Sequence, residues 1–348
     1  MKKIIFTGGG TAGHIYPSLA IIEDLPKDYE IHYIGGKGME KEIISKIPNI
    51  FYHQIDTVKL ERKLTLKNLL IPFRLHKSIK QAKKIINEIK PNIIFSKGGY
   101  VAVPVVIAGA KQKIPVLSHE SDLTIGLANK IILHYCKKMC VSFKETKKYN
   151  KKCIYTGQPI RKNILQGDKN KIKFNSYNKN NPNLLIIGGS TGAKFINEKV
   201  WQNLDSLTQN FNVLHITGKQ AKEQIKHNFY NQIQYSNNIG DCLDFADIIL
   251  SRAGSGAINE FLALKKTMLL IPLSKKCSRG DQIDNAKLFT KEGFCEMLEE
   301  ENYSDELLIN LLNALYKNKQ IYIKNMNQCV IPNTNQKIID LILKYEKK

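Results

Sequence analysis

Glycine-rich turns follow short apolar runs in both halves of the chain, and their composition suits the binding of an anion. Ile4–Thr7 leads into Gly8–His14, and Leu184–Ile187 leads into Gly188–Ala193. A glycine turn between a strand and a helix lets backbone N–H groups approach a phosphate at the helix N-terminus. Neither turn continues into Gly-Lys-Ser or Gly-Lys-Thr, so ATP hydrolysis is disfavoured. The pattern predicts one phosphate-binding loop in each half.

A third turn adds side chains suited to a nucleotide sugar. Ala246–Glu260 is typical of a strand, a glycine turn and the first turns of a helix. Glu260 lies where a carboxylate can accept hydrogen bonds from ribose hydroxyls, or where it simply complements the helix dipole. Further along, Gly280–Ala286 begins a polar helix whose amide and carboxylate side chains suit the hydroxyls of a sugar.

Sugar transfer from such a donor needs a base and a group that stabilises the leaving diphosphate. His14 is the candidate base, because imidazole titrates near neutral pH and this residue ends the first glycine loop. His14 could instead contact a diphosphate or the acceptor, or brace the loop, and His119 and Glu120 could orient or replace it. The helix after Gly188–Thr191 and Arg161 would meet the leaving-group charge. The chain contains no Asp-x-Asp triplet, which fits a metal-independent donor site and leaves loosely bound magnesium as the alternative. We expect no cofactor.

The elements that position these residues alternate between short apolar runs and segments of helical period, as in parallel sheets with crossover helices. The predicted strands are Ile4–Thr7, Ile31–Ile34, Ile93–Phe95, Val116–Ser118, Met139–Ser142, Leu184–Ile187, Val213–Ile216, Ile248–Leu250 and Met268–Ile271. Asp168–Asn183 is rich in Lys and Asn and is typical of a surface segment after a domain boundary. A chain of 348 residues suits two domains. We therefore predict two doubly wound α/β units in tandem.

The composition is that of a globular protein with a large positive charge. Lys and Arg number 53 against 31 Asp and Glu, a surplus that attracts nucleic acid, anionic membranes or phosphorylated substrates, although compositional drift explains it equally. The lysines are dispersed and no nucleic-acid-binding motif is present, so we expect no nucleic acid partner. The seven cysteines form no Cys-x-x-Cys pair, which favours reduced, buried thiols. Without a signal-peptide or membrane-spanning pattern, we expect a cytosolic protein.

In order along the chain, these motifs resemble the MurG family of bacterial glycosyltransferases, which add N-acetylglucosamine to undecaprenyl-diphosphate-linked muramoyl pentapeptide in peptidoglycan synthesis. The resemblance covers nearly the whole chain through the blocks Thr7–His14, Ser96–Tyr100, His119–Asp122, Gly126–Lys130, Thr156–Arg161, Gly188–Ala193, Ser251–Glu260 and Asp281–Ala286. Ala12 stands where the family often has glycine, and Asp122 stands where it often has asparagine. Because a carboxylate cannot donate a hydrogen bond as an amide does, Asp122 is left out of the donor contacts.

The resemblance implies the GT-B fold, two Rossmann-like domains facing across a cleft, and an inverting transfer that forms a β-1,4 link. It implies an acceptor-binding domain over 1–160, with helix 333–348 packing back on it, and a UDP-N-acetylglucosamine-binding domain over 161–332. The donor contacts that it implies are Thr11, Ala12, Gly13, Arg161, Ser190, Ser255, Gly256, Ala257, Ile258, Glu260 and Gln282. Within this set Ser190 would bind the diphosphate, Glu260 the ribose and Gln282 the sugar. His119 and Glu120 would lie on the acceptor side.

Residues 59–80 bear on membrane binding. Apolar and basic residues alternate there in the manner of an interfacial helix; the predicted contacts are Leu66, Leu69, Leu70, Phe73, Lys63 and Lys67. The alternative is an ordinary amphipathic helix that buries its apolar side in the core. A polyprenyl acceptor favours the first interpretation, and we predict peripheral binding to the anionic cytoplasmic face of the membrane.

Other UDP-sugar enzymes on this fold remain alternatives. They include a diacylglycerol glycosyltransferase and a UDP-N-acetylglucosamine 2-epimerase, and the epimerase would convert the nucleotide sugar without any lipid.

Overall fold

Two parallel sheets, one in each half of the chain, organise the protein. The computed structural model describes residues 1–57, 70–189, 191–219, 221 and 223–347. Unit 1 comprises Met1–Arg161 and Pro332–Lys348, and unit 2 comprises Lys162–Ile331.

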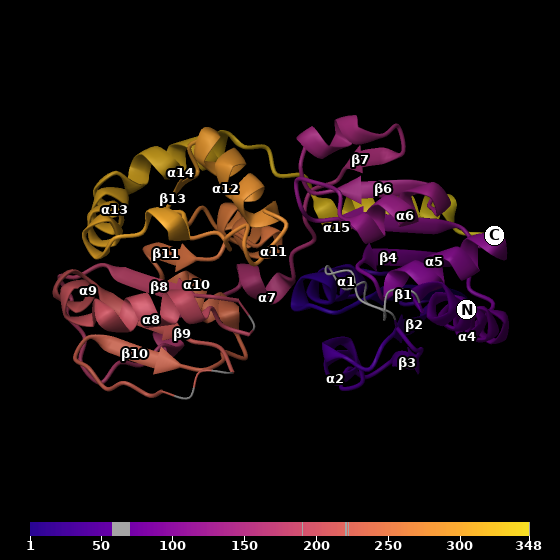
Figure 1. Ribbon diagram of the computed structural model, residues 1–348, viewed down its shortest axis with the longest axis horizontal. Coiled ribbons are helices and arrows are strands. Elements are labelled where there is room, and N and C mark those ends of the chain that lie inside the picture. The colour runs from indigo at the N-terminus through magenta and orange to yellow at the C-terminus, as the bar shows by residue number, and fades with distance from the viewer. Residues whose placement is uncertain (58–69, 190, 220, 222, 348) are drawn as a thin grey trace. The chain divides into compact units, whose positions relative to one another are not determined.

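The sheet of unit 1 has the order β3-β2-β1-β4-β5-β6-β7, and all its pairings are parallel. The strand labels can be followed in Figure 1. The strands are β1 (Lys2–Gly8), β2 (Tyr29–Gly35), β3 (Ile50–Gln54), β4 (Ile93–Gly98), β5 (Val116–Glu120), β6 (Lys138–Val141) and β7 (Cys153–Tyr155). The described helices are η1 (Ala12–His14), α1 (Tyr16–Ile22), α2 (Met39–Ile44), α4 (Ile71–Ile89), α5 (Ala102–Lys111), α6 (Leu127–Tyr135), η2 (Glu145–Tyr149) and α15 (Thr334–Tyr345).

Both faces of this sheet are buried, which explains why its strands are continuous apolar runs. Successive side chains of a strand point to opposite faces. Ile5 and Ile94 accordingly pack with residues of α4, α5 and α6. Ile4 and Phe95 pack in a second layer with residues of α1 and with Ile338 of α15, so the C-terminal helix completes the core of unit 1.

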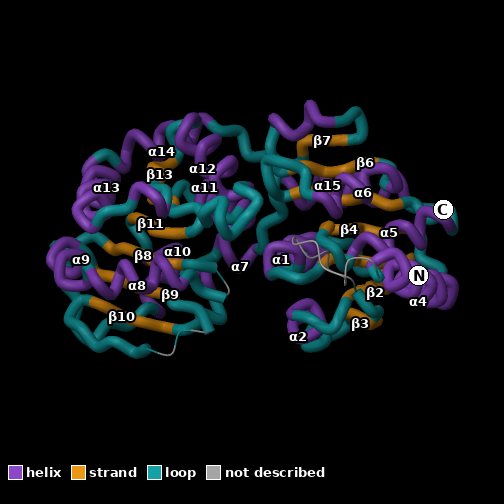
Figure 2. The backbone as a smooth tube through the Cα atoms, in the orientation of Figure 1, coloured by secondary structure: helices purple, strands orange, loops and turns teal. Residues whose placement is uncertain are grey.

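Unit 2 repeats the design with the parallel strand order β10-β9-β8-β11-β12-β13. Its strands are β8 (Asn183–Ile187), β9 (Asn212–Ile216), β10 (Tyr230–Ile233), β11 (Ile248–Ser251), β12 (Thr267–Leu270) and β13 (Cys295–Met297). Its helices are α7 (Lys162–Leu165), η3 (Lys169–Lys171), α8 (Lys194–Gln202), α9 (Leu204–Asn210), α10 (Ile239–Phe245), α11 (Ser255–Ala263), α12 (Asp281–Lys291), η4 (Glu300–Asn302), α13 (Asp305–Lys317) and α14 (Lys319–Gln328). Figure 2 shows helices on both sides of each sheet.

The predicted fold class, two doubly wound parallel-sheet units in tandem, is confirmed. All the predicted strands are present, with ends that differ by a few residues. The sequence patterns did not predict β3, β7, β10 and β13, which are the outermost strands of the two sheets. These strands are short or carry polar residues, because an edge strand is less completely buried than a central one.

The strand orders place a topological switch between β1 and β4 in unit 1 and between β8 and β11 in unit 2. At a switch point, the connections from the two neighbouring strands lead to opposite faces of the sheet. This leaves a crevice at the carboxyl ends of the two strands, where α/β sheets bind ligands. The first two glycine turns follow β1 and β8, and the third follows β11. All three therefore stand at a switch point of their own sheet.

Candidate functional site

The first glycine loop joins β1 to η1 and rests on a buried carboxylate. Glu40 is 1% exposed and accepts hydrogen bonds from the backbone N–H of Gly10 (3.1 Å) and of Gly36 (2.9 Å). The other side of the loop faces solvent, where Thr11 and Gly13 are exposed and Ala12 is half-buried. The loop is thus held by Glu40 on one side and exposed to solvent on the other.

His14 is half-buried at the end of this loop, and its Nδ1 lies 2.9 Å from Thr11 Oγ1. If Nδ1 carries the proton and donates it to Thr11, Nε2 holds the lone pair that a general base requires. His14 also lies close to Gly99, where an added Cβ would stand 3.5 Å from the imidazole Nδ1. The glycine at that position leaves room beside the ring.

His119 and Glu120, predicted on the acceptor side, are buried at the end of β5. The His119 ring is fully buried and its Nε2 lies 2.9 Å from the carbonyl oxygen of Gly157, so Nε2 carries the proton. Burial, and then the charge of Lys97, lowers the pKa of His119 well below its ordinary value, and the ring is neutral. The hydrogen bond thus links the end of β5 to the loop after β7.

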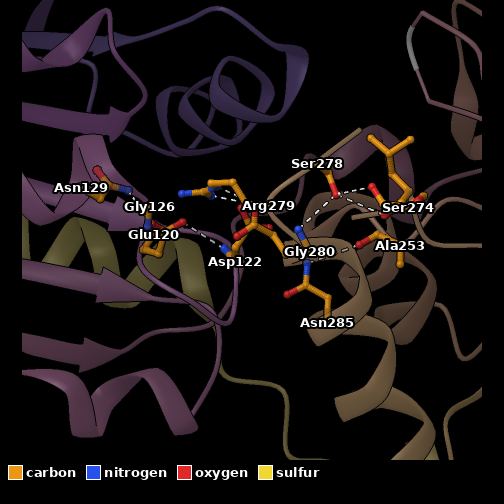
Figure 3. A network of polar contacts seen from close by, with 12 residues as sticks. Glu120, Asp122, Gly126, Asn129, Ala253, Ser274, Ser278, Arg279, Gly280 and Asn285 are labelled. Atoms are coloured by element: carbon orange, nitrogen blue, oxygen red, sulfur yellow. Dashed lines mark hydrogen bonds and ion pairs between the residues drawn. The ribbon is translucent and has the colours of Figure 1, made fainter. Parts of the chain in front are cut away.

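The Glu120 carboxylate is 5% exposed and is engaged by its own loop (Figure 3). It accepts hydrogen bonds from the backbone N–H of Asp122 (3.0 Å) and of Gly126 (3.0 Å), and from Asn129 Nδ2 (2.9 Å). Gly126 is the N-cap of α6 and Asn129 lies in its first turn. Glu120 therefore ties the loop after β5 to the start of α6.

Arg161 is the last residue of the first segment of unit 1. Its guanidinium carbon lies 4.1 Å from the centre of the Tyr16 ring, and the two groups form a cation–π pair. Its Nε is buried and has no hydrogen-bond partner among the described residues. The stacked, planar guanidinium suits recognition of a phosphate.

The second glycine loop joins β8 to α8 in unit 2. Gly192 has φ +84°, and a Cβ there would stand 2.1 Å from the carbonyl oxygen of Thr217, so only glycine fits. Asn197 donates to the same carbonyl at 2.9 Å. The predicted contact Ser190 lies outside the described residues.

The third glycine turn leads into α11, whose first helical residues are Ser255, Gly256 and Ala257. The N-cap Gly254 has open space at its Cβ position. Backbone N–H groups in a first helical turn have no partner within the helix and suit an anion. Ile258 is fully buried and its backbone N–H donates to the carbonyl oxygen of Gly254, whereas Glu260, two residues further on, is half-buried.

Gln282 lies in the first turn of α12, and its Oε1 accepts the backbone N–H of Leu273 at 3.0 Å. This contact orients the side chain and leaves the amide nitrogen as the donor. The neighbouring turn is ordered by Ser278, which donates to Ser274 O and accepts the N–H of Gly280 (Figure 3).

Arg252 and Lys97 lie within the motif blocks Ser251–Glu260 and Ser96–Tyr100, but neither was predicted to be a functional residue. Arg252 pairs with Glu300 at 2.6 Å and donates to the carbonyl oxygens of Ile271 (3.0 Å) and Pro272 (3.2 Å). It thereby links the loop after β11 to the end of β12. Lys97 is 1% exposed at the end of β4, and its Nζ donates to Ser121 Oγ at 2.6 Å. Only the tertiary structure reveals either set of contacts, because the partners are distant in sequence.

Of the predicted membrane contacts, Leu66, Leu69, Lys63 and Lys67 lie outside the described residues. Leu70 and Phe73, at the start of α4, are 49% and 77% exposed, so neither is a core residue. Among the described residues no helix is long and apolar enough to cross a membrane. In the same part of the chain, no group of three or more His, Cys, Asp or Glu residues is arranged to hold a metal ion.

Comparisons with known proteins agree on one family. Residues 4–141 match the glycosyltransferase family 28 N-terminal domain, and residues 183–342 match the glycosyltransferase family 28 C-terminal domain. The chain is 50% identical, over 100% of both chains, to a Clostridium botulinum protein (strain Hall) named UDP-N-acetylglucosamine--N-acetylmuramyl-(pentapeptide) pyrophosphoryl-undecaprenol N-acetylglucosamine transferase. A Clostridium tetani protein of the same name is 48% identical over 99% of this chain and 98% of its own. The crystal structure of Acinetobacter baumannii MurG has a TM-score of 0.77 and 26% identity, with 99% of this chain and 100% of that chain covered.

Proposed function

The chain belongs to the MurG family within glycosyltransferase family 28, and from this membership we propose its reaction and the division of labour between its two units. It is an N-acetylglucosamine transferase. Its donor is UDP-N-acetylglucosamine, and its acceptor is the undecaprenyl-diphosphate-linked N-acetylmuramoyl pentapeptide. The observation that carries this conclusion is the 50% identity over the full length of both chains to proteins of that name.

Unit 2 binds the donor in this proposal. The open Gly254 cap of α11 supports the assignment of Ser255–Glu260 as the segment that holds the nucleoside of the donor. Within this segment, Glu260 would accept hydrogen bonds from the ribose hydroxyls. Gln282, with its oxygen already held by Leu273, would donate its amide N–H to the sugar.

Unit 1 binds the acceptor and supplies the base. The 4-hydroxyl of the muramoyl sugar attacks the anomeric carbon, a new C1–O4 bond forms, and the bond from C1 to the UDP oxygen breaks. His14 Nε2 takes the hydroxyl proton, while Thr11 holds Nδ1. Attack from the face opposite UDP inverts the anomeric centre and forms the β-1,4 link. Arg161 and the helix N-termini of unit 2 would stabilise the departing diphosphate.

We also propose that the protein binds peripherally to the cytoplasmic face of the membrane, where a polyprenyl acceptor is located. Phe73 is 77% exposed and Leu70 is 49% exposed, beside Arg74 and Lys77. Apolar groups rimmed by cations suit an anionic lipid surface. The net charge of +22 also favours binding to an anionic lipid surface.

The test is transfer of radiolabelled N-acetylglucosamine from its UDP donor to a short-chain analogue of the lipid-linked pentapeptide. Glu260→Ala is expected to raise the KM for the donor about 10- to 100-fold, the effect of losing hydrogen bonds to a charged group. Glu198→Ala, an exposed carboxylate on α8, is the matched control and should leave the KM unchanged. Epimerised donor or released UDP without labelled lipid would point instead to another UDP-sugar enzyme on this fold.

A further inference from the structure

Lys97 is a buried lysine that the proposed reaction does not use. It lies at the carboxyl end of β4, next to the glycine loop after β1, and a Cβ added to Gly8 would stand 3.0 Å from its own Cβ. Its side chain is 1% exposed. Lysines are almost never buried to this extent unless a specific partner or function holds them there.

The Lys97 ammonium begins a chain of hydrogen bonds along the carboxyl edge of the sheet. Its Nζ donates to Ser121 Oγ at 2.6 Å, and Ser121 Oγ donates to Gln158 Oε1 at 2.8 Å. Ser142 Oγ donates to the same Gln158 oxygen at 2.8 Å. The lysine thereby fixes the loop after β5, which follows His119 and Glu120, against the loop after β7.

Four titratable groups interact with the ammonium or lie near it, and they come from β5, from the loop after β5 and from β6. His119 and Glu120 lie on β5, Asp122 lies in the loop after it, and Cys140 lies on β6. Burial lowers the pKa of Lys97 to about 8, and the two carboxylates oppose that shift. Burial also raises the pKa of the Cys140 thiol to about 12, so this group stays neutral. Glu120 and Asp122 thus supply negative charge near the ammonium, whose hydrogen bond goes to Ser121 Oγ.

We propose that Lys97 is a positioning residue for the acceptor side of the reaction. Its ammonium holds the segment from His119 to Asp122 in one geometry through Ser121, and it supplies positive charge near the carboxylates of Glu120 and Asp122. A lysine that served stability alone would lower the melting temperature when replaced, whereas a buried charged side chain can often be replaced by an apolar one of similar length without loss of stability. The proposal rests on the proposed function, because it concerns binding of the lipid-linked acceptor.

The first experiment measures steady-state transfer by the full-length protein with Lys97→Met. We expect the KM for the acceptor to rise about tenfold or more, the effect of losing a charge-assisted hydrogen bond. The KM for UDP-N-acetylglucosamine should change less than twofold, and the melting temperature should stay equal or rise. Lys266→Met is the matched control. This half-buried lysine precedes β12, at the opposite end of its sheet from the glycine turns, and donates to the carbonyl oxygen of Ala246 at 2.8 Å.

A second experiment tests the charge balance itself. Asp122→Asn combined with Lys97→Met removes one negative charge along with the ammonium, and we expect it to recover part of the acceptor affinity that Lys97→Met loses. In the wild-type protein, kcat/KM for the acceptor should fall as the pH rises through about 8, because the ammonium then loses its proton. This decline should be absent in Lys97→Met.

The outcomes distinguish a failure of the proposed function from a failure of the role proposed for Lys97. No transfer by the wild-type protein would refute the proposed function. Transfer by the wild type with an unchanged acceptor KM in Lys97→Met would refute only the role of Lys97. A lower melting temperature together with equal rises in the KM values for donor and acceptor would show that Lys97 is structural and would overturn the proposal. A double variant whose acceptor KM is no lower than that of Lys97→Met would also overturn it. If Lys97→Met does not fold, Asp122→Asn takes its place. A changed acceptor KM with a shifted pH profile would support the role of Lys97, and unchanged values of both would refute it.

Discussion

Replacing Glu120 by glutamine is expected to destabilise unit 1, because the side chain is an acceptor surrounded by donors. Its two oxygens accept hydrogen bonds from Asp122 N, Gly126 N and Asn129 Nδ2, at 2.9–3.0 Å. A glutamine has the same shape but only one acceptor oxygen. Whichever way the amide is turned, its NH₂ group faces at least one of these donors.

The size of the loss follows from the three contacts. One buried N–H without an acceptor costs about 1–3 kcal/mol, and the remaining bonds weaken because the acceptor is no longer charged. The side chain is 5% exposed, so solvent relieves little of this cost. We expect the free energy of unfolding to fall by about 2–4 kcal/mol, which in a domain of this size lowers the melting temperature by about 5–12 °C.

Differential scanning calorimetry of the wild-type protein and Glu120→Gln at pH 7.5 measures this difference. Glu42→Gln is the matched control, because Glu42 is an exposed carboxylate on α2 of the same unit. Transfer assays on the same samples should show a reduced kcat/KM for the acceptor, since α6 and the loop after β5 lose their link. A melting temperature within 1 °C of the wild type would refute the assignment of Glu120 as a buried, fully engaged carboxylate.

Two further predictions concern histidines. His14→Gln keeps a polar side chain that cannot act as a base near pH 7, and it is expected to lower kcat for transfer about 10²- to 10⁴-fold with nearly unchanged donor KM; a raised KM with an unchanged kcat would assign His14 to substrate contact instead. Burial lowers the pKa values of His32 and His53, whose rings lie 3.0 Å apart (Nδ1 to Nε2). Because the unfolded chain then binds more protons, calorimetry should show stability falling as the pH drops below about 6.5, less steeply in His53→Phe.

The sequence alone determined the architecture, because the hydrophobic period of strands and helices and the glycine turns between them follow from local physical constraints. A strand buried on both faces must be apolar throughout, so the central strands were visible as runs such as Ile93–Phe95. Glycine turns mark the places where a strand must turn sharply into a helix. The outermost strands were missed because edge positions relax that requirement, as in Tyr230–Ile233, whose Asn231 and Gln232 are polar and half-buried.

The same patterns predicted candidate side chains at the carboxyl edges, because parallel strands all end at the same side of a sheet. His14, Glu260 and Gln282 are each half-buried directly after a glycine turn or in the helix that such a turn begins. Their contacts with substrate stay predictions, since they depend on ligands. His119 and Glu120 look from the sequence like reactive groups, whereas in the fold His119 Nε2 and the Glu120 carboxylate form hydrogen bonds within their own unit.

Tertiary structure alone decided which polar groups are buried and what they contact. Lys97 lies in the block Ser96–Tyr100, but nothing in the sequence shows that folding buries its side chain and places its Nζ 2.6 Å from Ser121 Oγ. Arg252 and Glu300 are likewise joined only by the packing of unit 2. Hydrophobic period sets where strands and helices form, but burial and charge pairing arise from distant segments brought together. For that reason the sequence could predict the edges where the sites lie, and only the folded chain could show which residues hold those edges in shape.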